Sequence, residues 1–171
     1  MFFTRAASTT IRPLMKKISL GLSLLASLGV LMTGCGDSGS SCPTGEVDCD
    51  GICIAEIEPT LASIQTQIFS RSCAASSCHD AESPAAGLNL STALDSELNL
   101  VDVNSVQIPS MLRVAPGDSG ASYLMNKITG VGMAEGTTRM PQNNAGIVLC
   151  EPQISAIQQW IDAGADPVPS D

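Results

Sequence analysis

Large aromatic side chains are scarce in this chain, and the scarcity limits the kind of core that it can build. Trp160 and Tyr123 are the only residues of their types, and three phenylalanines complete the aromatic set. A domain of roughly 110 residues normally relies on such side chains to fill its interior. The composition, 44% hydrophobic and 15% charged, is otherwise that of a folding chain. The sequence therefore predicts that disulfides or a bound cofactor supply part of the core.

The first 34 residues have the pattern of a secretory signal peptide. Lys16 and Lys17 precede an uncharged, leucine-rich run that ends in small residues directly before Cys35. The end of this run resembles the lipobox of bacterial lipoproteins, which implies cleavage and lipidation at Cys35. Met15 is an alternative start for the same signal. We expect export across the inner membrane and a lipid anchor that holds the protein in the periplasm at the outer membrane.

The charge of the chain is distributed unevenly about Cys35. All seventeen acidic residues follow this cysteine, whereas four of the eight basic residues precede it, so the exported part carries a net charge of −13. Such a charge repels nucleic acid, and it favours high solubility or a basic protein partner. We expect no nucleic-acid partner.

A flexible tether (35–41) leads into a cysteine-rich neck (42–58). The neck is rich in turn formers and poor in apolar residues, so disulfides are its expected source of stability in an oxidising compartment. Together with one cysteine near the C-terminus, the neck offers an even set, for which three pairings exist. A bond to that distant cysteine would fasten the neck to the domain. The cysteines expected to pair are Cys42, Cys49, Cys53 and Cys150.

The run from Cys73 to Cys78-His79 is the strongest chemical motif in the chain. Two thiols followed directly by a histidine are typical of covalent haem attachment, in which the histidine ligates the iron. Four residues separate the two cysteines, whereas two is the usual number. A disulfide between Cys73 and Cys78 and a zinc site are alternatives, although a closed zinc site needs four ligands and His79 is the only histidine.

A second axial ligand for a haem iron would have to be a methionine, because no other histidine is present. Met140 is the preferred residue, since Pro141 follows it in a polar, glycine-containing segment. The four methionines available for this role are Met111, Met125, Met133 and Met140.

Helical periodicity and end signals predict helices at 60–70, 119–128 and 152–163, with a short turn or helix at 94–102. Pro59, Pro152 and Gly164 mark helix ends, and Asp118 or Ser119 can cap the middle helix. The predicted fold is mainly α, with long loops.

Several stretches from 59 to 166 together resemble a cytochrome c-like domain of secreted myxobacterial and planctomycete proteins, followed by a short tail (167–171). The stretches that carry the resemblance are 68–69, 86–91, 113–118, 122–124, 139–141 and 160–165.

The resemblance implies one haem c, bound through Cys73 and Cys78, with His79 as the proximal iron ligand and Met140 as the distal one. It offers Arg113 and Arg139 as partners for the haem propionates, and for both a solvated surface role is the alternative. These implied residues are Cys73, Cys78, His79, Met140, Arg113 and Arg139.

The implied function is one-electron transfer in the envelope to a redox partner that the sequence does not identify, without substrate chemistry. A haem-free, disulfide-stabilised lipoprotein that acts as a binding or structural module is the alternative. An enzyme subunit is disfavoured, because a peroxidase needs a distal acid-base residue and the chain has no second histidine.

Overall fold

The computed structural model describes residues 42–142 and 148–167. The signal peptide (1–34), the tether (35–41) and the lipidation site Cys35 lie outside the described residues. Within them, no helix is both long enough and apolar enough to cross a membrane.

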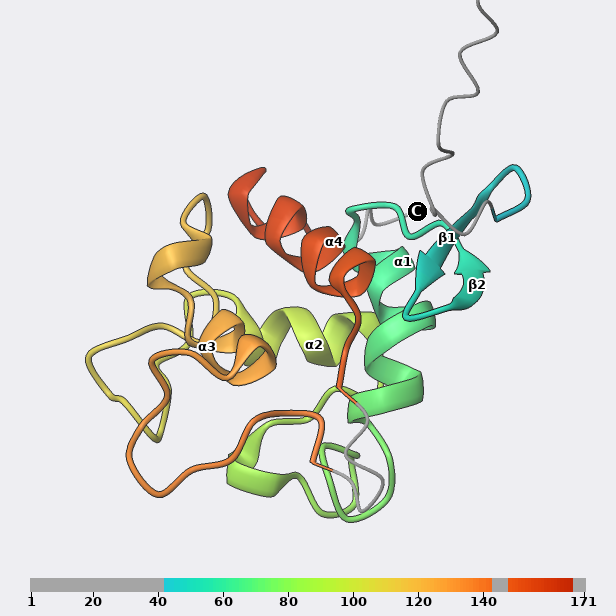
Figure 1. Ribbon diagram of the computed structural model, residues 1–171. Helices are drawn as coiled ribbons and strands as arrows, with labels where there is room; N and C mark the ends of the chain where they lie inside the picture. Colours follow the sequence, from blue (N-terminus) through green and yellow to red (C-terminus); the bar gives the residue numbers. More distant parts are fainter. Residues whose placement is uncertain (1–41, 143–147, 168–171) are drawn as a thin grey trace, which may run out of the picture. The chain divides into compact units, whose positions relative to one another are not determined.

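The neck folds as a β-hairpin (Figure 1). Strand β1 (Glu46–Cys49) pairs antiparallel with strand β2 (Ile52–Ala55), and Cys49 lies opposite Ile52. Asp50 and Gly51 form the two-residue turn with φ values of 53° and 88°, as a type I′ turn requires. Asp48 supports the turn, since its carboxylate accepts a hydrogen bond from the Gly51 N–H at 2.7 Å.

The prediction of a mainly α fold was wrong. The described residues form a small mixed α/β fold, with this two-stranded sheet and four short α-helices. The Asp50-Gly51 pair between alternating apolar residues is a strong hairpin signal. Strand pairing, and not only disulfide bonding, therefore organises the neck.

The first helical segment has two geometries. Helix α1 (Leu61–Ile64) begins at Thr60, whose hydroxyl accepts a hydrogen bond from the Ser63 N–H. The chain then continues as a π-helix, η1 (Gln65–Cys73), which ends at the first cysteine of the motif. The helix expected at 60–70 is thus present, and it begins one residue later and ends three residues later than predicted.

The remaining helices lie close to their predicted ranges. Thr92 caps α2 (Ala93–Leu100), and a short 3-10 turn, η3 (Ser119–Ala121), precedes α3 (Tyr123–Thr129). Asp118 caps η3 and not α3. Helix α4 (Glu151–Asp162) follows Cys150.

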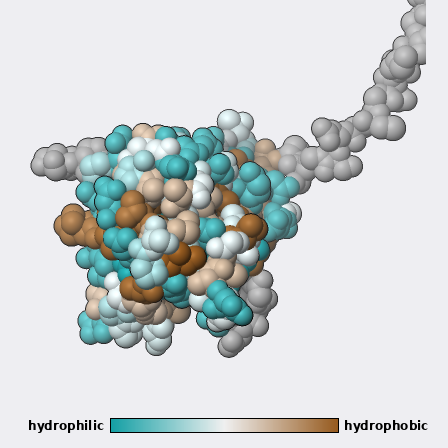
Figure 2. All heavy atoms as spheres, turned by 90° about the vertical axis from the view of Figure 1, so that its left-hand side faces the viewer, coloured by the Kyte–Doolittle hydropathy of each residue, from teal (hydrophilic) through white to brown (hydrophobic). Residues whose placement is uncertain are grey.

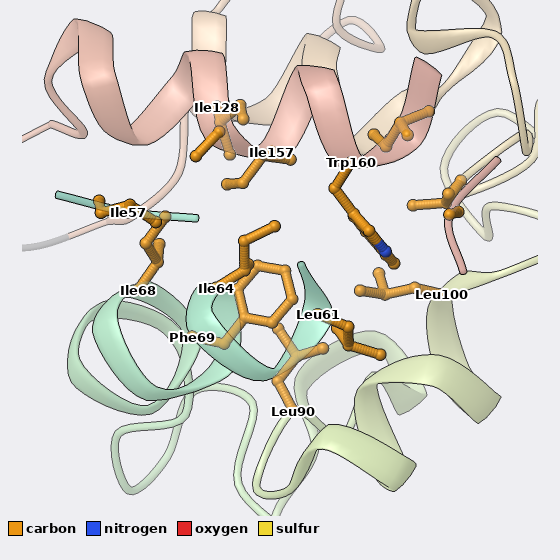
Figure 3. Close-up of a cluster of buried hydrophobic side chains, with 14 of the residues drawn as sticks. Ile57, Leu61, Ile64, Ile68, Phe69, Leu90, Leu100, Ile128, Ile157 and Trp160 are labelled. Carbon is orange, nitrogen blue, oxygen red and sulfur yellow. The ribbon is translucent and has the colours of Figure 1, made fainter. Parts of the chain in front are cut away.

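Helix α4 packs across the earlier helices and closes the core (Figure 3). Its inner face places Ile157 and Trp160, which are 0% and 2% exposed, opposite Ile64 and Phe69 from α1 and η1. Burial of a side chain of this size stabilises the fold by about 1.5–3 kcal/mol. The single tryptophan is therefore part of the buried core.

Two disulfides connect the four cysteines expected to pair. Cys42 bonds to Cys53 across the hairpin, and Cys49 bonds to Cys150 at the start of α4. The second bond fastens the neck to the helical part of the domain.

Exposed large apolar side chains are scattered over β2, α2 and three loops. Figure 2 shows apolar groups interspersed with polar ones on the face seen from the left-hand side of Figure 1. Single exposed apolar residues of this kind are ordinary on a folded domain. They are Ile52, Leu94, Leu98, Val106, Val131 and Val148.

Candidate functional site

The loop that carries the motif folds back on its own start. The Cys78 N–H donates to the Ala75 carbonyl at 2.9 Å, and the His79 N–H donates to the Cys73 carbonyl at 3.2 Å. Ser77 takes a left-handed conformation with φ of 71° inside this turn. The extra residues between the cysteines are therefore absorbed by a local turn that returns His79 to the first cysteine.

The ring of His79 is held through one nitrogen. Its Nδ1 lies 3.1 Å from the Leu88 carbonyl oxygen, and because a carbonyl only accepts, Nδ1 carries the proton. Burial lowers the pKa of His79, the Arg113 and Lys127 cations lower it too, and backbone hydrogen bonds to Leu88 and Ala85 oppose the shift. The imidazole is neutral at neutral pH, and its Nε2 lone pair is available to a metal.

A cavity of about 340 Å³ lies beside this loop, and most of its wall is apolar. Its volume falls within the range of small-molecule and cofactor sites. Buried core side chains from η1, α2, α3 and two loops form part of the wall, so the cavity borders the core, and Figure 3 labels four of these residues. The core residues concerned are Phe69, Leu90, Leu100, Ile128 and Leu149.

The cavity brings together residues that are far apart in the sequence. Cys73 and His79 of the motif line the cavity, and Met140 lines it from a later loop. Met111, Met125 and Met133 are not among its lining residues. Of the four methionines that the sequence offered as a distal ligand, Met140 alone reaches the cavity.

The loop that carries Met140 is hydrogen-bonded to α3. The Met140 N–H donates to the Lys127 carbonyl at 2.7 Å, and the Lys127 ammonium donates to the Thr138 carbonyl. Arg139 donates from Nε to the Ile128 carbonyl at 2.7 Å. Three successive residues of the loop are thus fixed to one end of α3.

Two cations line the cavity, and one of them was not predicted. Arg113 donates to the Asn99 and Ala86 carbonyls at 2.8 and 3.0 Å, and burial lowers its pKa. Lys127 is 9% exposed. Within the described part of the chain, both cations have backbone carbonyls as partners and neither forms an ion pair with a carboxylate.

Arg139, the other predicted propionate partner, is not among the lining residues. Its side chain packs against Gly130 and binds the Ile128 carbonyl. Lys127, which the sequence analysis did not single out, does line the cavity. The signal for it in the sequence was weak: Lys127 is the only lysine after Lys17, in a helix of mostly uncharged residues.

The two motif cysteines remain thiols, although the other four described cysteines are paired. Burial raises the pKa of Cys73 to about 12, and repulsion from the negative charge of the Cys78 thiolate adds to the shift. Cys73 lines the cavity, whereas Cys78 is half-buried in the loop and is not among the lining residues. The disulfide suggested as an alternative for this pair is not formed.

The chemistry of the cavity fits a large apolar ring that carries a metal and anionic groups. Apolar walls would hold the ring, and Cys73 lines the cavity. The Nε2 of His79 and the sulfur of Met140 are ligands of the type found in c-type cytochromes. Arg113 and Lys127 would neutralise carboxylates. Cys78 is not among the lining residues, and this position does not match a ring bound through both thiols.

Other metal chemistry finds little support in the described residues. No group of three or more histidine, cysteine, aspartate or glutamate side chains gathers there. The zinc site suggested as an alternative therefore lacks its ligands in this part of the chain.

Comparisons of this chain with protein-family models, with curated proteins and with solved structures found no match.

Proposed function

We propose that this chain is an electron-transfer protein of the cell envelope that carries one covalently attached haem c. The observation that carries the proposal is the meeting of Cys73, His79 and Met140 at one largely apolar cavity, although 66 residues separate the first from the last. When bound, the haem would supply a one-electron couple between Fe(II) and Fe(III).

The residues around the cavity have distinct roles in this proposal. His79 would be the proximal iron ligand, with its ring orientation set by the Leu88 carbonyl. Met140 would be the distal ligand. The thiols of Cys73 and Cys78 would each add to one vinyl group, with sulfur bonding to one carbon of the double bond and the thiol hydrogen going to the other.

Arg113 and Lys127 complete the proposed site as charge partners for the haem propionates. A buried lysine without an anionic partner is costly, because the charge loses hydration without compensation. A carboxylate in the cavity would provide that compensation. Anionic propionates would also account for the two positive charges that line an otherwise largely apolar cavity in an acidic protein.

We also propose that the protein is exported and held by a lipid at Cys35, which lies outside the described residues. If His79 and Met140 both hold the iron, protein side chains would leave no ligand position for a substrate, and this would favour electron transfer over substrate chemistry. The electron donor and acceptor would be other proteins of the envelope.

A second function is favoured by the position of Cys78. Because this thiol is not part of the cavity wall, the cavity also suits a haem-free module that binds an apolar carboxylate without a covalent bond. The two disulfides are compatible with such a module. In that case Arg113 and Lys127 would bind the carboxylate.

Production of the protein with a c-type maturation system separates the two functions. After denaturation and extraction, haem absorbance that stays with the polypeptide supports covalent attachment, and a Cys73→Ala/Cys78→Ala variant should lose it. A colourless product from the unaltered chain would overturn the cytochrome proposal.

Met140→Ala in the haem-loaded protein should abolish the absorption band of sulfur-ligated ferric haem at the red end of the spectrum. Met111→Ala is the matched control, since Met111 does not line the cavity, and it should leave the band intact. Loss of the band in both variants, or in neither, would remove Met140 as the ligand.

A further inference from the structure

A glutamine is buried on the apolar face of the first helical segment. Gln65 is 6% exposed, and it follows Leu61 by four residues, so it lies in the row of core side chains. Its amide is almost fully hydrogen-bonded. Nε2 donates to the Leu90 carbonyl at 2.8 Å and to the Ser70 hydroxyl at 3.0 Å, and Oε1 accepts from the Ser96 hydroxyl at 2.6 Å.

The orientation of this amide follows from its partners. The Leu90 carbonyl can only accept a hydrogen bond, so the nitrogen of Gln65 must face it. Hydrogen bonds inside a core are strong, and a buried polar group that loses its partner there is destabilising. Gln65 is thus a fixed link between η1 and Leu90.

Leu90 belongs to the short segment that holds His79 at two points. The Leu90 N–H donates to the His79 carbonyl at 2.8 Å, and two residues earlier the Leu88 carbonyl accepts from the His79 ring. The segment 88–90 is therefore hydrogen-bonded to both the backbone and the side chain of His79. Gln65 holds the same segment through the Leu90 carbonyl.

We propose that Gln65 is a positioning residue for His79, which acts through the segment 88–90 to keep Nδ1 protonated and Nε2 free to bind a metal. The inference rests on the proposed role of His79 as the iron ligand. A ligand whose other ring nitrogen is held by a fixed carbonyl has one tautomer and one ring orientation. An apolar residue at position 65 would fill the core but would leave the Leu90 carbonyl without its partner.

The tautomer of His79 can be read directly, because it is the only histidine in the chain. Long-range proton–nitrogen NMR spectra of the haem-free protein at pH 8.5, well above the ordinary histidine pKa of about 6.5, distinguish the two forms. We expect the Nδ1–H tautomer to predominate, whereas free histidine favours Nε2–H. A predominant Nε2–H form in the unaltered protein would overturn the proposal.

Gln65→Leu should at least halve the share of the Nδ1–H form. Gln67→Leu is the matched control: it makes the same change two residues along, where the amide binds the Glu56 carbonyl and the Ser63 hydroxyl instead. This control should keep the unaltered ratio. An unchanged ratio in Gln65→Leu would overturn the proposal.

Gln65→Asn provides a second test, because its amide is one methylene too short to reach Leu90 but remains polar. It should shift the tautomer ratio in the same direction. Trp160 fluorescence reports whether each variant folds. If neither variant folds, Gln65 serves the fold alone, and the positioning role is overturned.

The haem-loaded protein gives an independent readout. In a Met140→Ala background, where His79 would be the only protein ligand of the ferrous iron, Gln65→Leu should retain covalent haem and shift the iron–histidine stretching band in the resonance Raman spectrum, because the ring of His79 is less firmly hydrogen-bonded. Gln67→Leu should leave the band in place. A chain that attaches no haem would end the proposed function, whereas the tautomer measurement would still decide the effect of Gln65 on His79.

Discussion

Removal of the two disulfides, one at a time, should destabilise the protein by clearly different amounts. Cys49 and Cys150 are 101 residues apart in the sequence, whereas Cys42 and Cys53 are 11 apart. In the chain-entropy model these loops correspond to about 4.7 and about 2.8 kcal/mol at 25 °C. We therefore expect Cys49→Ala/Cys150→Ala to lower the free energy of unfolding by about 2 kcal/mol more than Cys42→Ala/Cys53→Ala.

Packing acts in the same direction as loop length. Cys150 is 3% exposed, so its truncation also leaves a small cavity at the start of α4. The difference between the two double variants should therefore not fall below the entropic value.

Urea unfolding of the haem-free protein, followed by the fluorescence of the single buried tryptophan, measures both losses. Mass spectrometry before unfolding checks that each double variant keeps its remaining disulfide. Equal losses, or a larger loss when Cys42 and Cys53 are replaced, would refute the argument from loop length. Such a result would indicate residual structure in the unfolded chain.

Three further predictions concern the site. At pH 8, iodoacetamide should alkylate Cys73 of the haem-free protein about a thousandfold more slowly than the same thiol in urea, because burial raises its pKa to about 12 from 9.0. Mass spectrometry follows the alkylation, and similar rates in the two conditions would contradict this burial. In a Cys73→Ala/Cys78→Ala background, Lys127→Met should weaken haemin binding about 10- to 100-fold in absorbance titrations, since one charge-assisted contact is lost. Arg71→Met, which removes an exposed cation, should have no effect, and equal effects of the two changes would exclude a specific role for Lys127. Gly130→Ala should lower the free energy of unfolding by about 1–2 kcal/mol, because φ is +82° at this position and the new Cβ would lie 3.2 Å from Cδ of Arg139. An unaltered midpoint of thermal unfolding would disprove this prediction.

The helices could be predicted from the sequence because their end signals are local. Thr60 and Thr92 are N-caps, and Gly130 ends α3 in the left-handed conformation. The π-helical geometry of η1 could not be predicted, since apolar residues at helical spacing do not distinguish it from an α-helix. The hairpin could have been predicted from Asp50 and Gly51, but the cysteines around them were interpreted only as disulfide partners.

The candidate site was predictable where its residues follow one another or share a chemical type. Cys73 and His79 belong to one short motif, and Met140 was chosen for its sulfur and its polar loop. Lys127 was missed because the burial of a cation depends on which segments fold over it, and periodicity does not report that. The position of Arg139 outside the cavity lining could not be predicted for the same reason, since it depends on a hydrogen bond to a backbone carbonyl.

The bond between Cys49 and Cys150 also determines how the protein would respond to a mechanical load. Every residue that lines the cavity, from Phe69 to Leu149, lies between these two cysteines in the sequence. Tension applied between the two ends of the chain would pass through the sulfur–sulfur bond and bypass that whole stretch. Only the segments before Cys49 and after Cys150 could be extended, and the residues that line the cavity would carry no tensile force.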